Sequence, residues 1–410
     1  MTKQRLMTGL SALLAVASAT ASAQDSLLDG LQSMVTDGKA SLNLRYRYEG
    51  VDQDNFDEDA KASTLRTRLT LSSGNYQGFS ALMEFDDVTA IGPDDYNSTT
   101  NGQSEFPVVA DPEGTSFNQG WLKYTAGEQS GTLGRQRITH GGQRFIGSVP
   151  WRQNEQTYDG LRGVFNVLEG LKLDISYVNQ VNRLFGPDDG AQPAEWEGDS
   201  VFTRADYALG ENHSIAGFGY IIDVEPIRGY ASGRAQDNSN TTVGIEYTGK
   251  LGPVKLAASY ATQSESGDST LDYDADYWFL EAGTKLGPVG VKAGYEVLGG
   301  GDGVGFKTPL ATLFKFQGWA DKFLSTPGDG VEDLYVGLSG SIGPVKLGAI
   351  YHDFSAEDSS DDFGTEVDLV ATWPIDKRFS LEARYANFSS DNSARFDDTE
   401  KFWLIAQMKL

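Results

Sequence analysis

The sequence predicts an all-β fold: a transmembrane antiparallel up-and-down β-barrel of about 18 strands, with short periplasmic turns and long extracellular loops. Three observations predict it. Apolar and polar residues alternate along most of the chain from Ala40 onward, and short connections alternate with long ones. After the first 23 residues, no run approaches the ~20 apolar residues that a spanning helix needs.

The alternation has the period of two that is typical of a strand with one apolar and one polar face. In the segment 41–49, the apolar face holds Leu42, Leu44, Tyr46 and Tyr48, and the polar face holds Asn43, Arg45 and Arg47. The last segment, 401–410, alternates in the same way, with Phe402, Leu404, Ala406, Met408 and Leu410 on one face. We expect this last strand to close the barrel against the first.

Alternation alone would also fit a soluble sandwich, and the connections decide between the two folds. Short turns such as Gly127–Ser130 and Leu251–Pro253 alternate with long polar segments such as Thr139–Glu155 and Gly299–Gly330. Short turns at one rim and long loops at the other are typical of bacterial outer-membrane barrels. The segments between them number eighteen, which is even, as closure of a hairpin barrel requires.

The N-terminus has the pattern of a secretory signal. Lys3 and Arg5 precede an apolar stretch that ends in Ala21-Ser22-Ala23, an A-x-A cleavage site. A membrane anchor is the alternative, but the apolar stretch is short and ends in small residues. We therefore expect a signal peptide at residues 1–23, a periplasmic N-terminal leader at 24–39 and a barrel at 40–410. The mature chain would lie in the outer membrane of a Gram-negative cell.

Composition excludes several classes of function. The chain has 410 residues, a formal net charge of -25 and no cysteine, so we expect neither a nucleic-acid partner nor thiolate chemistry. We expect no cofactor. A loop calcium site in the acidic segment 52–59 (DQDNFDED) is a weak alternative, because its spacing lacks the glycine and the terminal glutamate of an EF-hand loop.

Basic residues gather on the polar face of the early strands, which in a large barrel faces the lumen. The polar face is predicted to hold Arg45, Arg47, Arg66, Arg68, Lys123, Arg135, Arg137, Arg204 and Arg384. Acidic residues dominate the polar face of the later strands. Such charges commonly pair with one another, but the early strands carry few carboxylates to neutralise their arginines. They therefore favour an acidic solute.

The stretch 132–160, TLGRQRITHGGQRFIGSVPWRQNEQTYDG, concentrates arginines in an acidic protein. We expect Arg135 and Arg137 on the lumenal wall and Arg144 and Arg152 on an inward loop. The long segment Gly299–Gly330 is rich in apolar residues for an exposed loop, so we expect a short helix or an inward lid. Its aromatic residues Phe314, Phe316 and Trp319 would either stack on sugar rings or pack the loop onto the rim.

The stretch 134–160 resembles the outer-membrane alginate export family in its GRQ strand, its RF-x-G loop and its WRQN start of the following strand. A second block, 294–335, is similar to marine members in its YEVL, GF-TPLAT and GWADKFL segments. The resemblance implies an eighteen-stranded porin with an arginine-rich constriction for an acidic polysaccharide. It assigns this role to Arg135, Arg137, Arg144, Arg152, Glu155 and Asp159, together with Arg45, Arg47, Arg66 and Arg68.

The expected function is therefore an outer-membrane channel for acidic, uronate-type and alginate-like saccharides. A general porin with a mild anion preference is the alternative. An enzyme is not expected, because His140 lies in a loop with no serine elbow beside it. Expected partners are an acidic saccharide, outer-membrane lipid and lipopolysaccharide, and a monomer is expected rather than a trimer.

Overall fold

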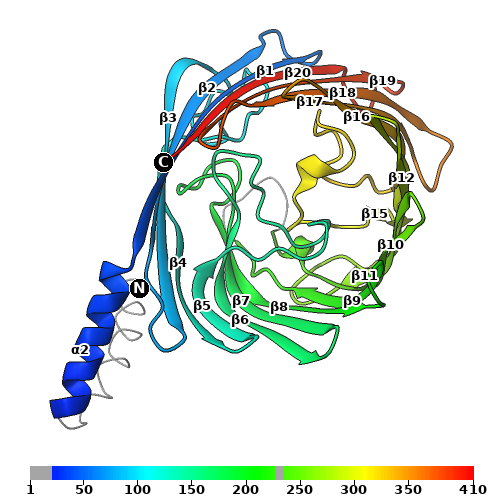
Figure 1. The fold of residues 1–410 in the computed structure, drawn as a ribbon. Helices are drawn as coiled ribbons and strands as arrows, with labels where there is room; N and C mark the ends of the chain where they lie inside the picture. The colour runs from blue at the N-terminus through cyan, green and yellow to red at the C-terminus, as the bar shows by residue number, and fades with distance from the viewer. Residues whose placement is uncertain (1–20, 228–234) are drawn as a thin grey trace.

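The computed structural model describes residues 21–227 and 235–410. The predicted signal peptide therefore lies outside the described residues except for its last three, which begin helix α2 (Ala21–Thr36). Figure 1 shows α2 projecting from the barrel beside the start of the first strand. Leu28, Leu31 and Val35 of this helix are exposed. Among the described residues, no helix is long and apolar enough to span a membrane.

Eighteen antiparallel strands form one sheet that closes on itself, because the first strand pairs with both the second and the last. The first nine are β1 (Lys39–Gln53), β2 (Ala60–Ser72), β3 (Phe79–Asp95), β4 (Gly114–Ala126), β5 (Gln129–Gln136), β6 (Thr157–Leu168), β7 (Leu171–Asn182), β8 (Glu195–Ala208) and β9 (His213–Ile222). The second nine are β10 (Asn240–Leu251), β11 (Val254–Glu265), β12 (Asp274–Leu286), β13 (Val289–Leu298), β16 (Val331–Ile342), β17 (Val345–Ser355), β18 (Asp362–Pro374), β19 (Phe379–Ser390) and β20 (Thr399–Lys409). The predicted fold class is confirmed.

The long connections carry the remaining elements. The 3-10 helix η1 (Ala235–Asn238) lies in the β9–β10 connection. The segment 299–330, called here the β13–β16 loop, contains β14 (Gly300–Gly301), β15 (Val304–Gly305) and the 3-10 helix η2 (Leu313–Lys315). This loop has the short helical turn that the sequence predicted.

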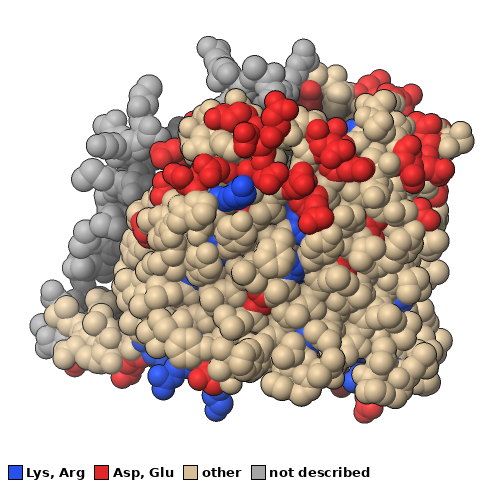
Figure 2. All heavy atoms as spheres, turned by 90° about the horizontal axis from the view of Figure 1, so that it is seen from above, with Lys and Arg blue, Asp and Glu red and all other residues tan. Residues whose placement is uncertain are grey.

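Each strand presents one face outward and one inward. The outward positions carry exposed apolar residues such as Leu69, Leu133, Leu280 and Leu404, as expected for a wall that faces lipid. Figure 2 shows the resulting broad band with few charged atoms, below a rim crowded with Asp and Glu. That rim is formed by the long loops, whose exposed carboxylates include those of the segment 52–59. On the face shown in Figure 2, exposed carboxylates are therefore concentrated at one rim of the barrel.

The main hydrophobic core lies inside the barrel, around loops that fold inward. Figure 1 shows segments of the β5–β6 loop (residues 137–156) and of the β13–β16 loop crossing the interior. Their buried aromatic side chains pack against inward residues of the strands, among them Tyr220, Tyr277 and Trp403. The β13–β16 loop is thus an inward segment, as the sequence predicted, and Phe314 and Trp319 are buried in its packing. The two inward loops therefore narrow the lumen where they cross it.

Candidate functional site

The two inward loops are joined to each other, and together they form the candidate constriction. The Gly147 amide donates to the Leu310 carbonyl at 2.8 Å, and the Thr312 amide donates to the Gln143 carbonyl at 3.0 Å. The ring of Trp151 in the β5–β6 loop stacks on a ring of the β13–β16 loop, that of Phe314, at 3.8 Å between centroids. These contacts make one unit, called here the paired loops.

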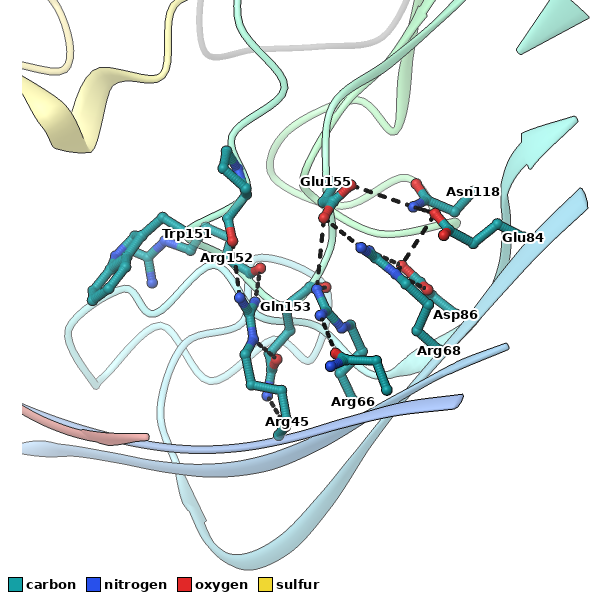
Figure 3. A network of polar contacts seen from close by, with 12 residues as sticks. Arg45, Arg66, Arg68, Glu84, Asp86, Asn118, Trp151, Arg152, Gln153 and Glu155 are labelled. Atoms are coloured by element: carbon teal, nitrogen blue, oxygen red, sulfur yellow. Dashed lines mark hydrogen bonds and ion pairs between the residues drawn. The ribbon is translucent and has the colours of Figure 1, made fainter. Parts of the chain in front are cut away.

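Arginines of β1 hold the paired loops against the wall through backbone carbonyls. Arg45 donates from Nη1 to the Pro150 carbonyl at 2.8 Å, from Nη2 to the Arg152 carbonyl and from Nε to Gln153 Oε1 at 3.0 Å. Arg47 donates to the Trp151 carbonyl at 2.7 Å. Figure 3 shows Arg45 and its neighbours on β2 pointing from the wall toward this loop. Guanidinium groups suit this role because each offers five donors in one plane.

On β2, Arg68 connects the wall to Glu155 at the end of the β5–β6 loop. The Arg68 guanidinium donates two hydrogen bonds of 2.6 Å to the Asp86 carboxylate of β3 and one of 2.6 Å to Glu155 Oε1. Arg66 lies 3.8 Å from the same carboxylate. Burial alone would raise the pKa of the Glu155 carboxyl. The charges of Arg68 and Arg137, with a smaller contribution from Arg66, overcome this effect and lower the pKa to about 2.

Arg144 and Arg152 lie on the inward loop, as predicted, and each reaches the β13–β16 loop. Arg152 bonds Glu49 at 3.0 Å and Asp321 at 3.2 Å. Burial opposes the charge of Arg152, but carboxylates led by Glu49 raise its pKa above the ordinary value. Arg144 bonds Glu296 of β13 at 2.7 Å and Gln317 Oε1 at 3.0 Å. Both arginines therefore stabilise the position of the paired loops.

A second group of cations lies on the inward face between β4 and β8, and its members other than Arg204 are less buried. Arg137 lies just past the end of β5, contacts Glu84 and Glu155 at 2.5 Å, and keeps 31% of its side chain exposed. Arg162 pairs with Asp174 at 2.5 Å, and Arg204 pairs with Glu246 at 2.7 Å. Lys123 faces inward on β4, and no ion pair joins it to another residue in the described part of the chain. We call Lys123, Arg137, Arg162 and Arg204 the cationic wall.

The predicted lumenal positions of Arg135 and Asp159 are wrong. Both residues share the outward face with Leu133 and Leu161, which are 60% and 54% exposed. They pair with each other at 2.7 Å on the outside of the barrel. Arg135 and Arg137 were expected on one face because they are two residues apart. The strand ends at Gln136, however, so the alternation stops and the chain turns inward.

The ion pairs around the paired loops form a balanced network. Its paired cations are Arg47, Arg66, Arg68, Arg137, Arg152 and Lys401, and its carboxylates are Glu49, Glu84, Asp86, Asp111, Glu155 and Asp321. Among the described residues, Arg45 and Lys123 have no carboxylate partner and stand outside this balance. The sequence did not single out Asp111 and Asp321, because each lies in a loop far along the chain from its partner.

Some inward carboxylates of the later strands are buried, whereas Glu246, Glu281 and Glu382 keep 18%, 28% and 21% of their side chains exposed. Asp333, Glu366 and Asp368 are at most 1% exposed. His352 contacts Asp333 at 2.8 Å, and the Glu366 carboxylate accepts the Ala320 amide of the β13–β16 loop at 2.7 Å. Glu366 thus holds the β13–β16 loop on the side opposite the cationic wall.

In residues 21–227 and 235–410, no group of three or more His, Asp or Glu side chains is arranged to hold a metal ion. His140 is buried, with Nδ1 at 3.2 Å from the Tyr220 hydroxyl and Nε2 at 3.5 Å from Asp174. Its side chain thus packs between the β5–β6 loop and the wall at β7 and β9.

A closed barrel with an apolar outer belt, inward loops and a charged interior is an outer-membrane channel. Residues 9–407 match the model of the Gram-negative porin family, and the chain belongs to that family. Proteins of this family and fold are channels rather than enzymes, and they lie in the outer membrane. None of the curated protein sequences matches the chain.

Solved structures show the same fold. Pseudomonas aeruginosa OccK3 (OpdO) has a TM-score of 0.68 at 17% identity, with 94% of this chain and 98% of that chain covered. Acinetobacter baumannii OccAB3 has a TM-score of 0.69 at 14% identity, with 92% and 100% covered. Pseudomonas aeruginosa OpdK, solved with vanillate, has a TM-score of 0.68 at 13% identity, with 92% and 99% covered. The alginate export subtype stays a prediction.

Proposed function

We propose that this porin is a diffusion channel for acidic solutes, with short uronate-type saccharides of the alginate kind as its substrate class. One observation carries the proposal: Arg45 and Lys123 face the interior without a carboxylate partner, in a chain whose net charge is -25. An unbalanced cation in a narrow, partly apolar passage attracts an anion strongly, since the local dielectric constant is lower than that of water.

The acidic rim does not oppose this proposal. Its carboxylates are exposed on the long loops, where salt screens their field over about 8 Å at physiological ionic strength. The cationic wall lies deeper, where a solute must lose part of its hydration and screening is weaker. The ion selectivity of the channel then follows the charge of the cationic wall rather than the charge of the rim.

The paired loops bear on the size of the solute. Trp151, Phe314 and Trp319 occupy the interior and stack on one another. Phe314 and Trp319 are buried, so they are not free platforms for sugar rings. This arrangement favours small or short solutes over a bulky polymer.

A general porin with a mild anion preference is the second candidate. It is favoured by the close pairing of most interior arginines, because a guanidinium that already holds a carboxylate attracts a passing anion less. The two candidates differ in whether uronates bind within the channel.

Planar-bilayer recording separates them. The purified protein is expected to be anion-selective in a potassium chloride gradient, and uronate oligomers added at micromolar to millimolar concentration are expected to block its current. Neutral oligomers of equal length serve as the control. Anion selectivity without uronate block would support the general porin, and cation selectivity would refute both candidates.

A further inference from the structure

A polar cavity lies beneath the paired loops, apart from the cationic wall. Its volume is about 150 Å³, and residues of β1, β18, β19 and β20 line it together with Trp151. Thr372 and Ser380 of its lining flank the short turn between β18 and β19. The cavity is therefore on the periplasmic side of Trp151, where a solute would arrive after passing the loops.

Arg45 brings to this cavity a charge that no ion pair within the described residues neutralises, and the Glu382 carboxylate, which also lines the cavity, is bonded to Arg384 instead. Its three hydrogen bonds go to two carbonyls and an amide oxygen, and no carboxylate among the described residues pairs with it. Its neighbours across β2 and along β1, Arg66 and Arg47, are also cationic. A buried charge without a counter-charge is unfavourable, so an anion near Arg45 would be stabilised.

Arg384 supplies hydrogen-bond donors to this cavity. Its Nε atom bonds Glu382 Oε1 at 2.7 Å, and the second oxygen of that carboxylate accepts the Thr372 hydroxyl at 2.9 Å. Within the described residues no hydrogen bond occupies the Nη atoms of Arg384. The rings of Trp151 and Trp319 lie 4.3 and 4.6 Å from its guanidinium carbon and fix its plane.

We propose that this cavity is a carboxylate-binding subsite for a sugar acid on the periplasmic side of the paired loops. The Nη atoms of Arg384 bind the carboxylate in the two-point geometry that guanidinium groups favour. Arg45 supplies the balancing charge, and Ser380 and Gln407 at the cavity wall offer polar contacts to hydroxyl groups. The subsite deepens the proposed function and rests on it, because it gives the acidic solute a second position after the cationic wall.

The test places a carboxylate inside the cavity. Gln407 pairs directly with Arg45 across β1 and β20, so Gln407→Glu neutralises the site with little change in shape. Ser380→Asp makes the same change from β19. Thr248→Glu is the matched control, since Thr248 is an exposed residue on the inward-facing side of β10, half the barrel away.

The full-length protein in detergent is titrated with galacturonate, and with galactose as the neutral probe, while binding is followed by the change in tryptophan fluorescence, to which Trp151 at the cavity contributes. Saturable binding of galacturonate alone is expected. Gln407→Glu and Ser380→Asp should weaken it at least tenfold, and Thr248→Glu should leave it unchanged. Unchanged binding in Gln407→Glu, or equal weakening in Thr248→Glu, would overturn the subsite.

Ion selectivity measured in planar bilayers separates failure of the subsite from failure of the proposed function. Gln407→Glu is expected to retain the sign of the wild-type reversal potential, because the cationic wall is intact. An anion-selective wild type with no galacturonate binding would refute the subsite alone. A cation-selective wild type would refute the proposed function, on which the subsite rests.

Discussion

Trp151 and Phe314 stack almost parallel, with 3.8 Å between ring centroids and 10° between planes. Each ring belongs to a different inward loop, and backbone hydrogen bonds join the same two loops. The narrow part of the channel is therefore a single body built from two distant segments of the chain. The hydrogen bonds and ion pairs between the paired loops and the strands set the position of the loops in the barrel.

Removing the stacked ring should loosen this body. Trp151→Ala deletes the contact to Phe314 and leaves a cavity, at a cost of about 3–5 kcal/mol in stability. We expect a larger and noisier single-channel conductance, because the paired loops lose the stacked rings that join them. Leu324→Ala is the control, since Leu324 lies on the same β13–β16 loop and is 52% exposed. Equal conductance of Trp151→Ala and the wild type would show that the stack does not set the width.

Arg135 and Arg137 offer a comparison between the two faces of the wall. Arg137→Gln removes an exposed interior cation and should shift the reversal potential toward cation selectivity. Arg135→Gln removes a cation on the outer face and should leave the reversal potential unchanged. Both are measured in bilayers under the same salt gradient. Equal shifts in the two variants would contradict the assigned orientation of β5.

Glu155 should make the fold sensitive to acid. Its folded-state pKa of about 2 is below the unfolded value of ~4.3, so its stabilising effect is present above that value. As the pH falls from ~4.3 toward 2, this contribution, on the order of 3 kcal/mol, is lost. Glu155→Gln should therefore lower the unfolding midpoint at pH 7 and flatten its pH dependence between 4 and 2.

Urea unfolding at a series of pH values measures both effects of Glu155→Gln. Glu128→Gln in the exposed β4–β5 turn is the matched control and should behave like the wild type. If Glu155→Gln kept the wild-type acid sensitivity, the ion network would not depend on this carboxylate.

Gly318 should tolerate no side chain. Its φ of +77° is in the left-handed region, and an added Cβ would lie 2.3 Å from the Glu366 carboxylate. Gly318→Ala should displace the β13–β16 loop from β18 and lower the thermal midpoint. Gly303 has a similar φ of +80° but open space around it, so Gly303→Ala isolates the backbone strain of about 1 kcal/mol. If the thermal midpoint fell by a similar amount in both variants, the clash with Glu366 would add nothing to the loss of stability.

The barrel could be predicted because its strands obey a local rule. Alternation with a period of two shows the faces of β1 and β2 directly, and the inward positions of Arg45, Arg47, Arg66 and Arg68 follow from it. Short and long connections then give the strand count. These signals depend only on residues close together in the sequence.

The constriction could not be predicted in the same way. Arg68 and Glu155 meet because a loop folds into the barrel, and no periodic pattern encodes that path. Arg135 was placed on the wrong face because the sequence does not show where β5 ends. Pairing between loops, such as Trp151 with Phe314, depends on the shape of the whole interior.

In the proposed function, the charge of the cationic wall sets the ion selectivity of the channel. The most direct test is the reversal potential in a potassium chloride gradient for the wild type and for a variant with Lys123→Gln, Arg137→Gln and Arg162→Gln combined. We expect an anion-selective wild type and a variant whose reversal potential moves through zero toward cation selectivity. A variant that remained as anion-selective as the wild type would contradict this role of the cationic wall.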